Sequence, residues 1–193
     1  MRPPAFHQTA TILAILAWGG LTGMRLLQAW RTLQVIPALL AVQAGMVALQ
    51  LMLRRPQTKP VPWSQMATAW VSACLPWVLE VAQDTLVGRV LGCAGIALAL
   101  IAMGTLGRSF GIAPADRSLV QTGPYRWIRH PMYLGELSAV LGAIYGNLSP
   151  WNFLILSLLL LTILLRIHWE EAAIDGYPGY TGQVRWRLIP FIF

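Results

Sequence analysis

A long apolar region near the C-terminus reads MYLGELSAVLGAIYGNLSPWNFLILSLLLLTILLRIH, residues 132–168. It is interrupted by GNLSP at 146–150, which combines turn-forming residues with a proline that cannot continue a helix. The region is therefore predicted to fold as a helical hairpin with two short arms.

Four other apolar runs precede this hairpin, at approximately residues 8–28, 33–53, 66–83 and 87–107. Each approaches the roughly 20 helical residues that cross about 30 Å of hydrocarbon. The 193 residues are 56 % hydrophobic and 11 % charged, whereas a soluble domain carries about 25 % charged residues. The sequence therefore predicts an all-α fold: a polytopic transmembrane helix bundle of four long spans plus the C-terminal hairpin, five to six membrane segments in all.

The basic residues predict how this bundle is oriented. With an even number of passes both termini lie on one side, together with all of the 14 Lys and Arg residues except Arg25, Arg31 and Arg89. The positive-inside rule predicts that this side is the cytoplasm. The same topology brings residues 108–131 and 166–193 to the cytoplasmic face, where the hairpin folds the two polar segments together.

The first polar segment contains GPYRWIRHPMYLGE, residues 123–136. Proline disfavours helix at the preceding residue and suits the first helical position, so His130 is predicted to stand at a helix start. The free N–H groups and positive dipole end of that first turn form a receptor for a carboxylate or phosphate. Arg126 and Arg129 lie just upstream and reinforce it.

The aromatic residues of this segment allow two interpretations. Trp127 and Tyr133 could be belt residues of an interfacial loop that anchors the helix among lipid headgroups. Together with Tyr125 they could equally form the walls of a flat pocket for an aromatic ring. The residues alone leave both interpretations open.

The second polar segment contains LLRIHWEEAAIDGYPGY, residues 164–180. Arg166 and Glu170 are spaced i,i+4 on one helical face, and Glu171 is adjacent. Ionisable groups at a membrane boundary are costly and usually face a cavity or each other, which makes them functional candidates. The alternative is an ordinary juxtamembrane charge cluster with one ion pair.

A pocket lined by both segments would offer a helix N-terminus for an anion, carboxylates for a cation or ribose hydroxyls, and aromatic walls for a base. This combination fits a nucleotide-like, zwitterionic cofactor. The sequence has no Ser/His/Asp set, no H-E-x-x-H, no metal-ligand cluster and no G-x-G-x-x-G after a predicted strand. Hydrolysis, a metal centre and a Rossmann domain are therefore not predicted. Nor is nucleic-acid binding, because the net charge of +7 is scattered through short loops.

The run LGRSFGIAPADRSLVQTGPYRWIRHPMYLGE at 106–136, followed by RIHWEE, YPGY and VRWRLIP, resembles the isoprenylcysteine carboxyl methyltransferase family. That family belongs to a wider group of integral membrane methyltransferases that includes phospholipid N-methyltransferases. The resemblance covers residues 106–190 and implies S-adenosyl-L-methionine as a methyl donor bound on the cytoplasmic side. It also implies a lipid or prenylated acceptor that enters from the bilayer.

The resemblance implies a role for each matching residue. Glu170 would close over the cofactor with Glu171 beside it, and Arg166 would hold the carboxylate of the acceptor. The remaining cofactor-binding residues would be Arg117, Ser118, Leu119, Val120, Tyr125, His130, Pro131, Met132 and Tyr133. The chain would form a single domain, with transmembrane helices in 1–107 and the cofactor loop, hairpin and tail in 108–193.

Three features depart from the family pattern. The connection from Glu171 to YPGY is short, and Gly176 and Pro178 would abbreviate the helix that usually follows the paired glutamates. Arg117 stands where many relatives have histidine, which implies a cofactor contact through the backbone alone. Glu136 adds polarity that has no assigned role.

The predicted function is S-adenosylmethionine-dependent methyl transfer to a membrane-embedded acceptor, and Arg166 favours the carboxylate of a prenylated cysteine or a similar isoprenoid. A phospholipid amine and a small thiol are alternative acceptors. Two further hypotheses are an NADPH-dependent sterol-type reductase and a non-enzymatic membrane protein whose charged loops serve only topology or docking.

Overall fold

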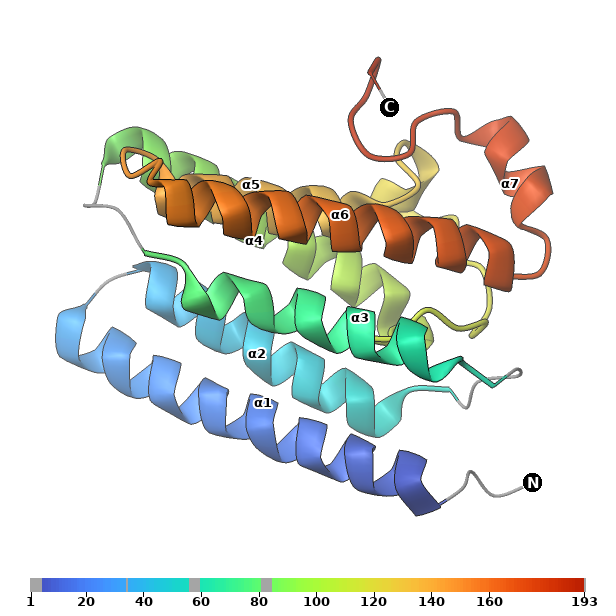
Figure 1. Ribbon diagram of the computed structural model, residues 1–193, viewed down its shortest axis with the longest axis horizontal. Coiled ribbons are helices and arrows are strands. Elements are labelled where there is room, and N and C mark those ends of the chain that lie inside the picture. Colours follow the sequence, from blue (N-terminus) through green and yellow to red (C-terminus); the bar gives the residue numbers. More distant parts are fainter. Residues whose placement is uncertain (1–4, 34, 56–59, 81–84, 193) are drawn as a thin grey trace. The chain divides into compact units, whose positions relative to one another are not determined.

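The computed structural model describes residues 5–33, 35–55, 60–80 and 85–192, and they are largely helical (Figure 1). By internal packing the chain divides into two units, Met1–Arg54 and Arg55–Phe193. Within the described ranges there is no β-strand, and an isolated bridge pairs Ile128 with Trp186. The all-helical prediction is confirmed, whereas the single-domain prediction stays a prediction.

The first unit is a pair of packed helices, α1 (Ala5–Thr32) and α2 (Val35–Leu53). Gly45 of α2 faces Thr22 of α1, and a Cβ at Gly45 would make an ordinary van der Waals contact, 3.5 Å from Cγ2 of Thr22. At the end of α2, Arg54 Nη2 donates a hydrogen bond of 2.7 Å to Thr11 Oγ1. Packing and this polar contact thus join the two helices.

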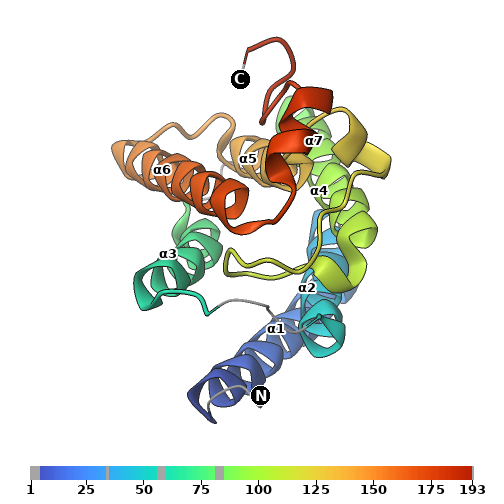
Figure 2. The same ribbon diagram turned by 90° about the vertical axis from the view of Figure 1, so that its right-hand side faces the viewer.

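The second unit carries the remaining elements, which Figure 2 shows grouped around the loop that follows α4. The α-helices are α3 (Trp63–Cys74), α4 (Leu86–Leu106), α5 (Pro131–Ile144), α6 (Pro150–Ala173) and α7 (Tyr177–Gln183). Short 3-10 helices occur at η1 (Leu75–Val78), η2 (Gly107–Ser109) and η3 (Gly123–Arg126).

Four helices of the described chain are long and apolar enough to cross a membrane, at Thr11–Arg31, Ile36–Leu53, Leu86–Ser109 and Pro150–Ala173. The predicted span at 66–83 is wrong in its length. Its helix α3 has only 12 residues and passes into the 3-10 helix η1, which contains Pro76. A proline cannot donate the next backbone hydrogen bond, so the α-helix ends there. Residues 81–84 of that run lie outside the described ranges.

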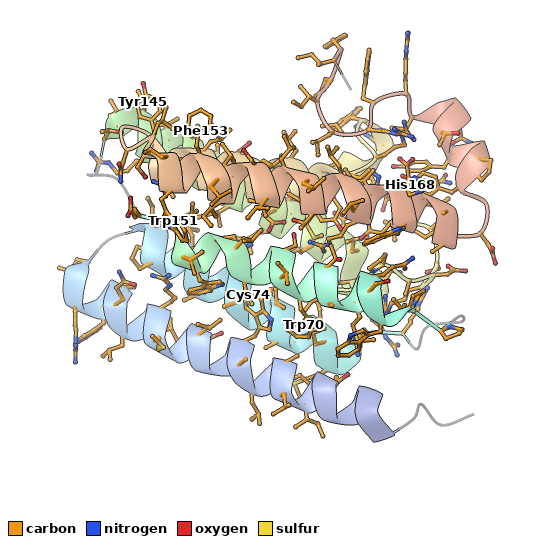
Figure 3. All side chains as sticks on the ribbon, in the orientation of Figure 1. Trp70, Cys74, Tyr145, Trp151, Phe153 and His168 are labelled. Carbon is orange, nitrogen blue, oxygen red and sulfur yellow. The ribbon has the colours of Figure 1, made fainter. Side chains whose placement is uncertain are left out.

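The predicted hairpin is confirmed, but its arms are unequal. Helix α5 has 14 residues, whereas α6 has 24 and is one of the four long helices. Ser149 ends the turn and caps α6, because its hydroxyl accepts a hydrogen bond of 3.2 Å from Asn152 N. Large apolar side chains of α6, such as Trp151 and Phe153, are exposed (Figure 3), as expected for a helix that faces lipid.

Helices α4 and α5 pack with their backbones in direct contact. A Cβ on Gly95 would lie 2.4 Å from Ala139 N, and one on Gly142 would lie 2.4 Å from Gly92 N. Only glycine permits this approach, the device by which helices associate closely in lipid. Gly146 does not take part: it has a φ of +92° and shapes the hairpin turn. This packing fixes the start of α5, where the polar residues lie.

Candidate active site

A cavity opens between the loop after α4, the start of α5, the end of α6 and helix α7. The space between these elements is about 670 Å³ when its open mouth is counted. Most of the predicted cofactor residues line it, namely Arg117, Ser118, Leu119, Val120, Tyr125, His130, Met132, Tyr133 and Glu170. The structure therefore gathers residues from both polar segments around one space.

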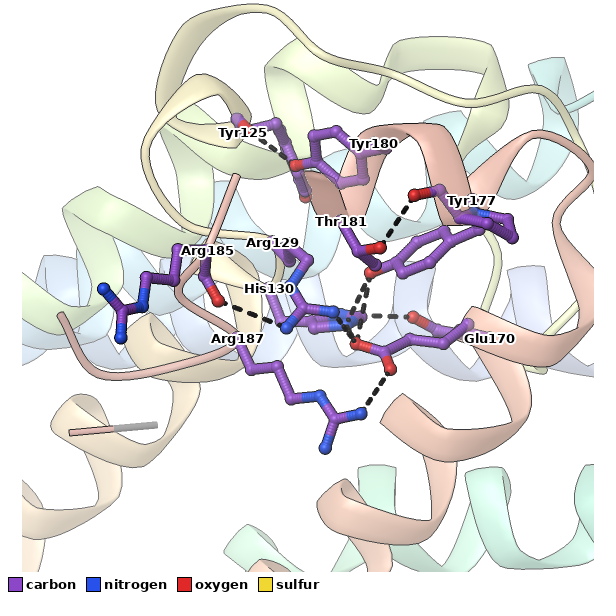
Figure 4. Close-up of polar contacts among 11 residues, drawn as sticks. Tyr125, Arg129, His130, Glu170, Tyr177, Tyr180, Thr181, Arg185 and Arg187 are labelled. Carbon is purple, nitrogen blue, oxygen red and sulfur yellow. Dashed lines mark hydrogen bonds and ion pairs between the residues drawn. The ribbon is translucent and has the colours of Figure 1, made fainter. Parts of the chain in front are cut away.

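The contact between the two polar segments is centred on His130. The ring is buried and lies with Nδ1 3.7 Å from Glu170 Oε2 and Nε2 3.3 Å from Glu171 Oε1. The hydroxyl of Tyr177 lies 3.0 Å from the same Nε2. The prediction that residues 108–131 and 166–193 meet is thus confirmed. Figure 4 shows these side chains converging from α5, α6 and α7.

Glu170 faces the cavity from the last turn of α6. Its Oε1 accepts a hydrogen bond from the hydroxyl of Tyr133, a residue of the first turn of α5. The carboxylate keeps 20 % of its surface exposed, whereas the His130 side chain keeps 6 %. Glu170 is therefore held at one oxygen by a hydrogen bond and stays partly accessible to a bound molecule.

The start of α5 presents backbone donors to the same space. The helix begins at Pro131 with His130 as its N-cap, as predicted, and the N–H of His130 donates to Arg187 O at 2.9 Å. Proline has no N–H, so the first-turn amides that lack a partner within the helix are those of Met132 and Tyr133. Both residues line the cavity, and the positive end of the helix dipole points there.

Glu171 lies beside the cavity and is held by two arginines. Its Oε1 is 2.9 Å from Arg129 Nη1 and its Oε2 is 2.9 Å from Arg187 Nη2. Glu171 and Pro131 were predicted to bind the cofactor, but neither is among the residues described as lining the cavity. Pro131 is buried and supports the cavity by starting α5.

Arg166, predicted to hold the acceptor, lies behind the cavity wall. It is 4 % exposed, and its guanidinium donates to Ile112 O at 3.0 Å and to Ser72 Oγ at 3.3 Å. It also lies over the ring of Tyr133, 4.7 Å from the centroid. Arg166 therefore contacts the cavity through Tyr133 in this conformation.

The loop after α4 forms the opposite wall. Ser118 has a φ of +86°, an unusual conformation for a residue with a Cβ, and its N–H donates to Asp116 Oδ1 at 3.2 Å. Its hydroxyl is bonded to Ser109 and Arg55. Arg117 is buried and its Nη1 donates weakly to Ala113 O at 3.4 Å. The loop is thus shaped by its own polar contacts.

Two tyrosines of the YPGY motif are cavity residues that the sequence did not single out. Tyr177 and Tyr180 pack edge to face, with centroids 5.4 Å apart, and both line the cavity. Tyr180 donates a hydrogen bond of 2.5 Å to Tyr125 O. Burial raises the pKa of the Tyr180 hydroxyl to about 12 and raises the pKa of the Tyr125 hydroxyl as well. Both hydroxyls are therefore neutral at physiological pH.

Arg129 and Arg187 also contribute to the site. Arg129 was predicted only to reinforce the anion receptor at the start of α5, and Arg187 was not predicted as a site residue. Their motifs, RHPMY and VRWRLIP, were the available signal, but nothing in the spacing indicates that both reach Glu171. Trp127, one possible pocket wall, is 61 % exposed and pairs with Arg126 at 4.3 Å from its ring centroid. It is not among the described lining residues.

Comparison with known proteins matches the segment that contains most of the cavity residues. The phospholipid methyltransferase family model matches residues 85–176, a segment that runs from the residue before α4 to the residue before α7. None of the curated proteins compared with the chain matches it. Residues 85–176 are thus similar to the phospholipid methyltransferase family, which is one family of the integral membrane methyltransferase group that the sequence motifs resemble.

Proposed function

We propose that the protein transfers a methyl group from S-adenosyl-L-methionine to a lipid acceptor that enters from the bilayer. One observation carries the proposal: His130 at the start of α5 and Glu170 at the end of α6 lie 3.7 Å apart at the edge of one cavity. The family match supports the same reaction class. Both termini and the cavity are proposed to face the cytoplasm, because of the distribution of basic residues.

The residues around the cavity suit this donor. The two free first-turn amides of α5 offer a receptor for its carboxylate. The Glu170 carboxylate suits its ammonium group or its ribose hydroxyls. Tyr125 and the apolar side chains of Leu119 and Val120 offer a surface for its adenine base. Together these cavity residues therefore fit a zwitterionic nucleoside.

The donor supplies an electrophilic methyl group on a sulfonium whose leaving group is neutral. The protein then has little acid or base work to do, and its contribution is to place the acceptor in line and to exclude water. Buried Tyr133 and the stacked pair of His130 and Tyr177 close the inner side of the cavity. The absence of a nucleophilic triad in the sequence is consistent with this role.

Two acceptor classes follow from different observations. A carboxylate acceptor, such as a prenylated cysteine, is proposed from Arg166, whose fork can bind a carboxylate with two hydrogen bonds. In the described conformation that fork contacts Ile112 and Ser72, so it would have to exchange partners. A phospholipid amine is proposed from the family match. Both acceptors keep the same donor site.

The decisive experiment supplies the purified protein in lipid nanodiscs with a methyl-labelled donor and a membrane lipid extract. We expect label in a lipid, and its identification names the acceptor. Phosphatidylethanolamine and a farnesylated cysteine analogue are then compared as pure acceptors across pH. An amine must lose a proton before attack, so its rate rises with pH below the amine pKa, whereas a carboxylate is already ionised above about pH 5.

Binding measurements separate the remaining hypotheses. The proposal requires the protein to bind S-adenosylhomocysteine, the demethylated product of the donor, more tightly than NADPH. The reverse order would support the sterol-type reductase instead. If the protein binds neither molecule and labels no lipid, the methyltransferase proposal is refuted in favour of a non-enzymatic membrane protein.

A further inference from the structure

We propose that Glu171 is a positioning residue, which holds the donor-binding side chains in place by tying them to the C-terminal tail. The tail is defined as residues 184–188 and the clasp as Glu171 with Arg129 and Arg187. This inference rests on the proposed function. Its starting point is that Glu171 is not among the described lining residues, yet it touches Arg129, His130 and Tyr177, which all line the cavity.

The clasp joins three segments that are distant in sequence. Glu171 lies in the last turn of α6, Arg129 precedes α5, and Arg187 lies in the tail. The carboxylate uses one oxygen for each arginine, at 2.9 Å in both cases. Because the Glu171 and Arg129 side chains are only 13 % and 9 % exposed, removing the carboxylate leaves a largely buried guanidinium without its charged partner, although Nη2 still donates to Arg185 O at 3.3 Å.

The tail also holds the same loop through its backbone. Arg129 N donates to Trp186 O and His130 N donates to Arg187 O, both at 2.9 Å. Ile128 and Trp186 form the isolated parallel bridge, and Leu188 is buried in the core between α5 and α6. The residue that caps α5 and faces Glu170 is thus held from behind by the tail. The side-chain clasp and the backbone pairing reinforce each other.

The two arms of the clasp are not equal. Arg187 is 42 % exposed, so its pair with Glu171 is weakened by solvent, whereas the pair between Arg129 and Glu171 is largely shielded. Loss of Glu171 breaks both pairs and the contacts to His130 and Tyr177 together. The expected order of effects on donor binding is therefore Glu171→Gln first and Arg187→Gln second.

The test measures S-adenosylhomocysteine binding by calorimetry for the full chain in nanodiscs. We expect the affinity to fall about tenfold for Glu171→Gln, which is the scale of one lost charged interaction. For Arg187→Gln we expect it to fall about threefold, which is the scale of half such an interaction. Arg187→Lys should restore most of the affinity because it keeps the charge. Arg185→Gln is the matched control: it removes a charge two residues away, whose guanidinium lies over Trp186 instead of contacting Glu171.

A second readout needs no ligand. The amides of Arg129 and His130 are bonded to the tail, so hydrogen exchange in a peptide covering 128–134 should be faster in Glu171→Gln and Arg187→Gln than in Arg185→Gln. Faster exchange together with weaker binding supports the proposal. Faster exchange with unchanged binding would show a purely structural clasp and overturn it, as would exchange and binding that both match the control. If the unaltered chain binds no S-adenosylhomocysteine although exchange responds as expected, the proposed function fails, and the positioning role fails with it.

Discussion

The seam between α4 and α5 and the polar cluster at the end of α6 are held together in opposite ways. In the seam, Gly95 and Gly142 bring backbone against backbone with no side chain between them. In the cluster, Glu170 and Glu171 reach across to His130 through charged and polar side chains. Lipid offers little hydrophobic drive between helices, so shape complementarity holds the seam. Charge can then be concentrated at the helix ends, where the proposed chemistry takes place.

This contrast predicts that a single methyl group in the seam has a larger effect than most changes in the cluster. In Gly95→Ala the new Cβ would meet Ala139 N at 2.4 Å and Gly135 O at 2.7 Å. Backbone atoms cannot swing aside as a side chain can, so the helices must separate. We expect a loss of about 2–3 kcal/mol in stability, measured by thermal unfolding in detergent, together with weaker donor binding.

Gly104→Ala is the matched control on the same helix. A Cβ at Gly104 meets no described heavy atom within 4 Å, and alanine favours helix over glycine by about 0.5–1 kcal/mol. This variant should be as stable as the unaltered chain or more stable. Equal destabilisation by the two substitutions would show that helix propensity, and not the seam, governs α4.

Substitutions in the polar cluster should weaken S-adenosylhomocysteine binding while the protein stays folded. Glu170→Gln keeps the size of the side chain and an oxygen that can accept from Tyr133, but it removes the charge facing His130. A hydrogen bond to a charged group is worth about 1.5–3 kcal/mol, so S-adenosylhomocysteine affinity should fall by roughly 10–100-fold. Calorimetry measures the loss, and unfolding should shift far less than in Gly95→Ala.

Asp175→Asn controls for the loss of negative charge nearby, because Asp175 is an exposed residue just beyond the end of α6. Its affinity for S-adenosylhomocysteine should lie within about twofold of that of the unaltered chain. If Glu170→Gln behaves like Asp175→Asn, then Glu170 does not contact the donor and the cluster is only a structural network.

Local sequence rules correctly predicted the start of α5 and the turn between α5 and α6. A proline constrains the residue before it, so RHPMY placed His130 at a helix start, and GNLSP placed the hairpin turn. The error at 66–83 arose because hydropathy outweighed Pro76, although the proline was present in the run. The rule that a proline ends an α-helix, applied to Pro76, would have predicted the end of α3 correctly.

The other features of the site depend on contacts between residues that are far apart in the sequence, and no local sequence pattern predicts these contacts. The chain has 14 basic residues, and only the folded tail shows that Arg187 reaches Glu171. The parallel bridge of Ile128 with Trp186 likewise joins segments separated by α5, α6 and α7. Arg166 was predicted to hold the acceptor carboxylate, and its described partners Ser72 and Ile112 come from α3 and the loop after α4.

A smaller effect is expected from Tyr133→Phe, which affects the cluster without removing a charge. It removes the hydroxyl that donates to Glu170 and keeps the ring that Arg166 covers. One hydrogen bond contributes about 0.5–1.5 kcal/mol, or up to 3 kcal/mol where one partner is charged. Because Glu170 keeps its contact with His130, we expect only about a threefold to tenfold loss of S-adenosylhomocysteine affinity by calorimetry. A loss as large as that of Glu170→Gln would mean that Tyr133 alone orients the carboxylate.

The smallest effect is an alkaline loss of stability that comes from α7. Burial raises the pKa of Tyr180 to about 12, whereas an unfolded tyrosine titrates near pH 10. Between these values the unfolded chain binds fewer protons than the folded chain, so stability falls as pH rises. The contribution of this hydroxyl is complete below pH 10 and is lost as pH rises through about 12. Tyr177 acts in the same direction, because burial and the neighbouring Glu171 raise its pKa further.

Thermal unfolding followed between pH 8 and 12 tests this window. Tyr180→Phe should lose about 1 kcal/mol at pH 8, because its bond to Tyr125 O is gone. Between pH 10 and 12 the stability of Tyr180→Phe should then fall by less than that of the unaltered chain, because phenylalanine has no proton to release. Tyr145→Phe, at an exposed position beyond the end of α5, should follow the unaltered chain. If the stability of Tyr180→Phe and that of Tyr145→Phe fall equally above pH 10, the alkaline loss of stability does not arise from the Tyr180 hydroxyl or from its contact with Tyr125.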